Sequence, residues 1–212
     1  MRLYFILAGL AIVTILALID FAETAETAES AYSKIDFEKG CAWASSPSEE
    51  EAQMGGKAVC EGYLDYQIYF SEDDLRHFTA YGPVDDPAQF PNGFTEWNSV
   101  HDVVEWRLEN AKPIAVIQRW FLDNVDPDTG SADADRRGQV LVISTVTQKD
   151  APNGMKVSCP LGYVDARANK NANELAREIA DNLGTVFKCG EDRPKFYGIR
   201  GPFSGTPNDL AQ

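Results

Sequence analysis

Residues 104–109 carry the pattern that most constrains the fold, a strict alternation of apolar and charged side chains. Its apolar members are Val104, Trp106 and Leu108, and its charged members are Glu105, Arg107 and Glu109. Successive side chains of a strand point to opposite faces, so this period of two predicts a half-buried β-strand. The turn-like sequence NAKP follows, and residues 114–122 form a second apolar run. The segment therefore predicts a β-hairpin within an antiparallel sheet.

One segment predicts a helix clearly. NANELAREIADNLG starts at Asn171, a favourable N-cap residue, has Glu174 three residues later and ends at Gly184. Its apolar side chains form one stripe, made of Ala172, Leu175, Ala176, Ile179 and Leu183. We expect a helix over about 171–183 that covers one face of the sheet, while Arg177 and Asp181 face water.

The remaining chain predicts further strands, separated by loops. Residues 33–43, 59–70, 139–146 and 156–166 are strand-like, with a turn or bulge at Leu64-Asp65, and a helical turn is expected from Ser71. Residues 82–98, rich in proline and glycine, and the polar residues 123–138 indicate loops. The expected fold class is α+β, an antiparallel twisted sheet of about 5–7 strands with the helix packed on one face.

The N-terminus predicts export. Residues 3–19 are uncharged and apolar, Arg2 precedes them and an acidic stretch follows. This arrangement predicts a signal peptide or an N-terminal membrane anchor over residues 1–30, with the rest of the chain outside the cytoplasm. Small residues permit cleavage after Thr24 or after Ser30. We expect a periplasmic or secreted protein or, if the segment is kept, a protein anchored in the inner membrane with its domain facing the periplasm.

The four cysteines all follow the leader, and outside the cytoplasm they indicate two disulfides. Of the three connectivities we favour Cys41–Cys60 with Cys159–Cys189, which closes loops of about 20 and 30 residues. No C-x-x-C pair is present to suggest a metal site. Residues 31–190 are expected to form a single domain, and residues 191–212, rich in glycine and proline, a flexible tail.

The formal net charge of −14 argues against nucleic acid as a partner, because the chain would be repelled by phosphates. Membrane contact is expected only through residues 3–19. The acidic loop NVDPDTGSADAD at 124–135 lacks the glycine and the bidentate glutamate of a calcium-binding EF-hand loop, so neither a metal nor a cofactor is expected.

The hairpin contains the candidate site: Glu105, Arg107 and Arg119, flanked by Trp106 and Trp120. A three-residue loop keeps Pro113 out of the strand ladder and sets Glu105 opposite Arg119. We expect an ion-pair ladder on a partly covered face. The functional alternative is a pocket in which Arg107 or Arg119 holds an anionic ligand.

Catalytic motifs are scarce. The chain has two histidines, His77 and His101. Asp102 follows His101, but neighbours in a strand point to opposite faces, so this pair is not expected to form a dyad. No G-x-S-x-G is present, and the expected disulfides leave no free thiol. We therefore expect a binding or accessory protein more than an enzyme, with an envelope protein or a small anionic ligand as partner. The alternative is a hydrolase that uses Glu105 or Asp165 as acid/base with arginine support.

Several motifs together resemble a family of exported bacterial proteins of unknown function. They are EWR (105–107), RW (119–120), C-x3-YVDA (159–166) and NANELAREIAD (171–181). The resemblance implies the compartment and the fold type, but no reaction.

Overall fold

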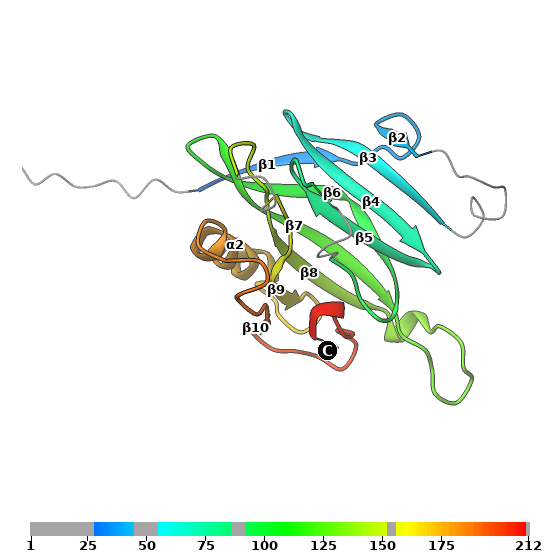
Figure 1. Cartoon of the computed structure of the whole chain (residues 1–212). Coiled ribbons are helices and arrows are strands. Elements are labelled where there is room, and N and C mark those ends of the chain that lie inside the picture. Colours follow the sequence, from blue (N-terminus) through cyan, green and yellow to red (C-terminus); the bar gives the residue numbers. More distant parts are fainter. Residues whose placement is uncertain (1–27, 45–54, 86–91, 152–155, 211–212) are drawn as a thin grey trace, which may run out of the picture.

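The computed structural model describes residues 28–44, 55–85, 92–151 and 156–210, arranged as two sheets and one α-helix (Figure 1). The six-stranded sheet has the order β1 (Glu29–Lys34), β6 (Trp97–Glu109), β7 (Lys112–Asp123), β8 (Gly138–Thr145), β9 (Pro160–Asp165) and β10 (Phe196–Tyr197). The four-stranded sheet has the order β2 (Cys41–Trp43), β3 (Gly55–Tyr63), β4 (Tyr66–Asp73) and β5 (Arg76–Tyr81). The helices are α2 (Ala172–Leu183) and two single 3-10 turns, η1 (Ala134–Arg136) and η2 (Asn208–Leu210).

The α+β class and the helix are confirmed, but the expectation of one antiparallel sheet is wrong. Two sheets are present, and β10 runs parallel to β9. The expected strand over 33–43 divides between them, because β1 ends at Lys34 and β2 starts at Cys41. Between the two strands, the Asp36 carboxylate accepts hydrogen bonds from the backbone N–H groups of Glu38 and Lys39 and so stabilises a turn.

Turns divide the other expected segments of this sheet. The strand expected over 59–70 is the β3–β4 hairpin, and its turn at Leu64 has a positive φ of 53°. The helical turn expected from Ser71 is wrong, since β4 continues to Asp73. Asp74 and Leu75 both have positive φ, 47° and 59°, as in the two-residue turns that match strand twist. The hydrogen bonds between β4 and β5 thus outweigh the helix-capping pattern that starts at Ser71.

The β6–β7 hairpin has a different register from the one expected. Asn110 and Ala111 form a two-residue turn with positive φ at both positions. Pro113 lies within the ladder opposite Leu108, and an irregularity between Arg107 and Leu108 shifts the pairing beyond it. Glu105 consequently lies opposite Ile117 instead of Arg119.

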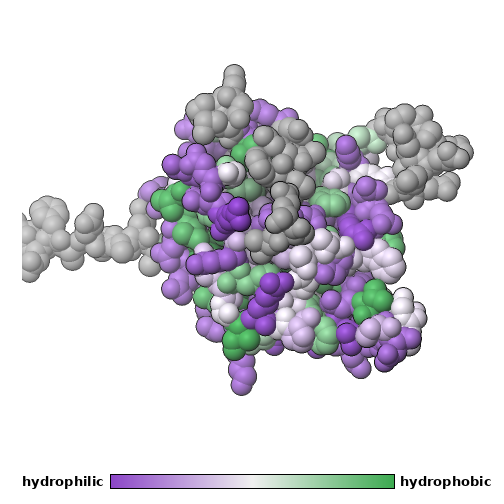
Figure 2. Space-filling model, turned by 60° about the horizontal axis from the view of Figure 1, so that its bottom comes forward, coloured by the Kyte–Doolittle hydropathy of each residue, from purple (hydrophilic) through white to green (hydrophobic). Residues whose placement is uncertain are grey.

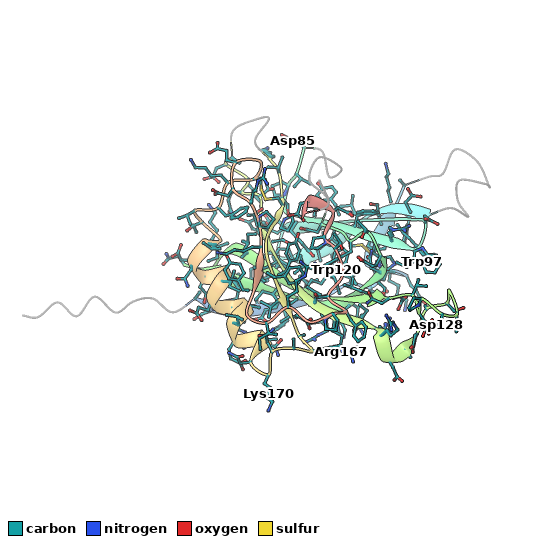
Figure 3. All side chains as sticks on the ribbon, turned by 90° about the horizontal axis from the view of Figure 1, so that it is seen from below. Asp85, Trp97, Trp120, Asp128, Arg167 and Lys170 are labelled. Carbon is teal, nitrogen blue, oxygen red and sulfur yellow. A yellow bond between two sulfur atoms is a disulfide. The ribbon has the colours of Figure 1, made fainter. Side chains whose placement is uncertain are left out.

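The elements form three layers, with α2 on one face of the six-stranded sheet and the four-stranded sheet on the other (Figure 1). Small and branched side chains fill the space under α2, among them Ala115, Ile117, Ile143, Ala176 and Ala180. Larger side chains fill the space between the sheets, among them Ile68, Phe70, Tyr81 and Trp106. A third cluster contains Phe94, Trp120, Leu122 and Tyr163. Viewed from below, Trp120 lies in the interior and Asp128 in an outlying loop (Figure 3).

Both disulfides match the prediction. Cys41 and Cys60 are direct cross-strand partners of β2 and β3, and Cys159 joins Cys189, which follows α2. No free cysteine is present. One disulfide therefore holds the four-stranded sheet, and the other holds the helix side of the molecule.

Residues 191–210, expected to be a flexible tail, are packed onto the domain. They supply β10, a β-bridge between Pro207 and Phe94, and a hydrogen bond from the buried Tyr163 hydroxyl to Asp209. The Arg200 guanidinium also lies over the Phe196 ring, 4.4 Å from its centroid. Aromatic and arginine side chains give this segment contacts that its glycine and proline content does not suggest.

The expected leader lies almost entirely outside the described residues, although β1 already begins at Glu29, two residues before the expected domain start. Among the described residues, no helix has both the length and the apolar character needed to cross a bilayer. Figure 2 shows a mostly hydrophilic face on which, beside the grey atoms, hydrophobic residues lie in small separate groups.

Candidate functional site

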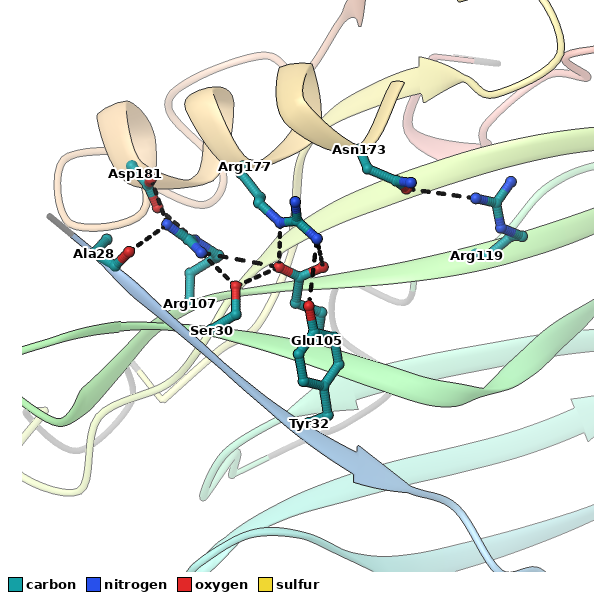
Figure 4. Close-up of polar contacts among 9 residues, drawn as sticks. All are labelled: Ala28, Ser30, Tyr32, Glu105, Arg107, Arg119, Asn173, Arg177 and Asp181. Carbon is teal, nitrogen blue, oxygen red and sulfur yellow. Dashed lines mark hydrogen bonds and ion pairs between the residues drawn. The ribbon is translucent and has the colours of Figure 1, made fainter. Parts of the chain in front are cut away.

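Glu105 lies at the centre of a polar network between β1, β6 and α2 (Figure 4). Its Oε1 accepts a hydrogen bond from Ser30 Oγ at 2.6 Å and another from Arg177 Nε at 2.6 Å. Arg177 Nη2 reaches Glu105 Oε2 at 3.3 Å. The hydrogen bond to the carboxylate raises the pKa of Arg177 above its usual value. Both oxygens of the carboxylate are therefore engaged.

All three nitrogens of the Arg107 guanidinium also have hydrogen-bond partners. Its Nε and Nη2 donate to Oδ1 and Oδ2 of Asp181, both at 2.7 Å, in a bidentate ion pair. Nη2 also donates to the Ala28 carbonyl at 2.7 Å, and Nη1 donates to Ser30 Oγ at 2.5 Å. The side chain is only 7% exposed. Arg107 has a structural role and is not available to hold a ligand.

The expected ion pair between Glu105 and Arg119 is therefore wrong, because helix residues supply the partners. Arg177 and Asp181 were expected to face water, yet they pair with Glu105 and Arg107. One signal in the sequence fits this pairing. Four residues along a helix rise about 6 Å, and two residues along a strand rise about 6.6 Å. The distance from Arg177 to Asp181 along the helix is therefore close to the distance from Glu105 to Arg107 along the strand. The charges also alternate in opposite order, so each residue of one pair lies beside an opposite charge of the other.

The two tryptophans of the candidate site lie on the other face of the six-stranded sheet. Trp106 packs against residues of the four-stranded sheet, and its Nε1 donates to Ser33 Oγ at 2.9 Å. Trp120 packs against Phe94 and Tyr163, and its Nε1 has no hydrogen-bond partner among the described residues. Both are fully buried. The period of two that predicted the strand thus separates them from the charged residues.

Arg119 differs from the other two charged residues because its recorded partners are neutral. Its Nη1 donates to Gln139 Oε1 at 3.1 Å, and its Nη2 donates to Asn173 Oδ1 in the first turn of α2 at 3.5 Å (Figure 4). No ion pair joins it to a carboxylate anywhere in the described ranges. Desolvation of this half-buried guanidinium lowers its pKa from the usual value. Arg119 thus carries a charge that the described structure does not neutralise.

Asp165 has a structural role. Its Oδ1 accepts hydrogen bonds from the backbone N–H groups of Arg167 and Ala168, and its Oδ2 accepts one from Gly201. The residue is 3% exposed. This carboxylate therefore joins the turn before α2 to the C-terminal segment and is shielded from a substrate.

Each histidine uses its Nδ1 to accept a hydrogen bond from a backbone N–H group, and each also lies near a carboxylate, Glu72 for His77 and Asp102 for His101. His77 Nδ1 accepts a hydrogen bond from Val100 N at 3.2 Å. His101 Nδ1 accepts one from Val103 N at 3.0 Å and also lies 3.2 Å from Asp102 Oδ1, although a strand places adjacent side chains on opposite faces. The short distance arises where the β6–β7 ladder is irregular, between Val100 and Val104.

The acidic loop forms turns. Asp126 Oδ1 accepts hydrogen bonds from the N–H groups of Asp128 and Thr129, and Asp133 Oδ1 accepts one from Asp135 N. Within residues 28–44, 55–85, 92–151 and 156–210, no three or more histidine, cysteine, aspartate or glutamate side chains converge as metal ligands would.

Comparisons with known proteins found no relative of this chain. No family model matches the sequence, and no curated protein or solved structure matches it significantly. The resemblance to a family of exported bacterial proteins stays a prediction.

Proposed function

We propose that the protein is an exported, non-enzymatic binding protein of the cell envelope that holds an anionic group at Arg119. The observation that carries this proposal is the contrast among the three candidate charges. Glu105 and Arg107 are paired with α2, whereas the side-chain hydrogen bonds that Arg119 makes to other described residues go to the neutral amide oxygens of Gln139 and Asn173.

A half-buried guanidinium without a counter-charge is poorly solvated, so an incoming anion gains more there than at an exposed lysine. A carboxylate fits the planar donor fork of arginine in a bidentate manner. Gln139 and Asn173 could turn their amide N–H groups toward the same ligand, because amide side chains both donate and accept. The positive end of α2 adds to the potential at Asn173.

The hydrolase alternative receives less support. An acid/base carboxylate must exchange a proton with its substrate. Glu105 is bound by Ser30 and Arg177, and Asp165 is bound by three backbone N–H groups. No cysteine is free to act as a nucleophile. The disulfides also agree with an oxidising compartment.

A titration tests the proposal. Protein labelled with ¹⁵N is titrated with N-acetylglutamate, and the Nε–H resonance of Arg119 is followed by NMR. We expect a saturable shift that weakens at least tenfold in Arg119→Gln. Arg193→Gln is the matched control, because Arg193 is exposed and its side chain has no hydrogen-bond or ion-pair partner among the described residues. An equal response in wild type and Arg119→Gln, or none in either, would exclude this site.

A second experiment separates binding from catalysis. The purified protein is incubated with generic ester, glycoside and peptide substrates, and we expect no turnover above background. Turnover that disappears in Glu105→Gln while the fold is retained would replace the binding function with the hydrolase.

A further inference from the structure

The acidic stretch before β1 contains three equivalent cleavage positions. Residues 22–30 read AETAETAES, so a small residue stands three places and one place before the cut in each copy. The cuts fall after Thr24, after Thr27 and after Ser30. Signal peptidases require small residues at these two places, so this requirement does not choose among the three cuts.

The folded domain distinguishes these positions, because the end of the third copy is part of its polar network. Ser30 Oγ lies between two ionic side chains, 2.6 Å from Glu105 Oε1 and 2.5 Å from Arg107 Nη1. The Ala28 carbonyl accepts a hydrogen bond from Arg107 Nη2. Glu29 and Ser30 also pair with Leu108 and Arg107 of β6.

We infer that the leader is removed before Ala28, so that Ala28, Glu29 and Ser30 stay on the mature chain. The inference rests on export, which the proposed function includes. Water and a leader peptidase hydrolyse the peptide bond after Thr24 or after Thr27. Cleavage leaves a carboxylate on the leader and a free α-amino group on Ala25 or Ala28.

Cleavage after Ser30 would have a different result. The mature chain would lose the hydroxyl group between Glu105 and Arg107 and the carbonyl group that accepts from Arg107. It would also lose two of the six residue pairs that join β1 to β6. Asp181 would still accept from Nε and Nη2 of Arg107, but Nη1 would lose its hydrogen bond to Ser30 and Nη2 would lose its bond to Ala28. Because Arg107 is buried, water replaces these bonds poorly. The exported product would be less stable.

The first test reads the mature N-terminus. The full chain, with its own leader and a C-terminal affinity tag, is produced in a Gram-negative bacterium, and the intact mass of the folded protein is measured. We expect a mass that starts at Ala25 or Ala28. A folded product that starts at Ala31, or a chain that is not cut, would overturn the inference. The Arg119 titration on the same preparation reports on ligand binding independently of the start.

The second test measures the physical cause. An unrelated leader is joined directly to Ala25, Ala28 or Ala31, and the melting temperatures of the three exported proteins are compared. We expect the first two to agree and the third to melt lower by about 4 °C or more, or to be recovered unfolded. Equal melting of all three would show that Ala28 and Ser30 do not matter to the fold, and the inference would then fail.

Discussion

Both faces of the six-stranded sheet are covered, one by a core of large apolar side chains and the other by a helix that small apolar side chains and paired charges hold. On the face toward the four-stranded sheet, Trp106 and Tyr81 lie within an apolar core. On the face toward α2, Glu105 and Arg107 come from the same strand as Trp106 and pair with helix residues. Small side chains such as Ala176 let the helix approach closely over the centre of that face.

The difference shows how burial determines the partner each side chain needs. Between two sheets, water is excluded and large apolar side chains gain most from burial. At the edge of a helix, water stays close, so charged side chains can be kept if each is paired. Arg107 is nearly buried and has a bidentate partner, whereas Arg177 at 36% exposure also stays in contact with water.

The largest expected effect concerns the two disulfides, of which one lies in the four-stranded sheet and the other on the helix side of the six-stranded sheet. Their sequence separations are 19 and 30 residues, so chain entropy predicts roughly 3–4 kcal/mol for each and about 7 kcal/mol for both. Cys41→Ala/Cys60→Ala and Cys159→Ala/Cys189→Ala should thus lower the free energy of unfolding by similar amounts in urea denaturation. A loss below about 2 kcal/mol with both bridges removed would show that loop closure is not what they contribute.

Trp106→Ala examines the apolar face. The side chain is fully buried between the sheets, and its removal should lower the free energy of unfolding by about 3–5 kcal/mol. Trp97→Ala is the control, because Trp97 is 37% exposed, and it should cost under about 1.5 kcal/mol. Equal losses in the two variants would mean that the core between the sheets is not tightly packed.

Glu105→Gln and Arg177→Met examine the helix face. Because Arg177 is partly exposed, we expect a loss of about 2 kcal/mol for the first variant and about 1 kcal/mol for the second, below the range for fully buried pairs. The double variant should lose less than their sum.

Arg119→Met serves as the control for this cycle. It should cost under about 1 kcal/mol and show no coupling to Glu105, because no recorded contact joins the two side chains. Coupling of Glu105 to Arg119 instead of Arg177 would restore the ion pair expected from the sequence and contradict the network described above.

The smallest expected effect is a dependence of stability on pH, caused by His77 in the four-stranded sheet. Burial lowers the pKa of His77 below 6.5, although Glu72 acts in the opposite direction. The unfolded chain therefore binds a proton at a higher pH than the folded one. Stability from this source is complete above the unfolded pKa and is lost as the pH falls through the lower, folded pKa.

Melting temperatures at about pH 7.5 and about pH 5.5 measure this effect around the ordinary histidine pKa. When the pH is lowered from the first value to the second, the melting temperature of the wild type should fall more than that of His77→Gln, which lacks the titrating group. A larger acid loss in the variant would reverse the sign of the predicted linkage.

The sequence by itself determined the features that depend on near neighbours. The helix expected over 171–183 is α2, Ala172–Leu183, because its apolar stripe is set by residues within a few turns, although Asn171 makes no side-chain capping hydrogen bond. Each disulfide joins cysteines that are near along the chain and lie in one part of the fold. The alternation at 104–109 correctly predicted a strand with Trp106 and Glu105 on opposite faces.

Only the tertiary structure decided which side chains meet across long separations. Glu105 pairs with Arg177, 72 residues away, and Arg107 with Asp181, 74 residues away. The β6–β7 register and the second sheet depended on turns at Asn110-Ala111 and Asp74-Leu75, whose positive φ values the residue types do not require. Local preferences are worth a few tenths of a kcal/mol per residue. Burial of a large aromatic side chain stabilises the fold by several times more, and a buried charge without a partner destabilises it by several times more, so long-range packing selects the partners.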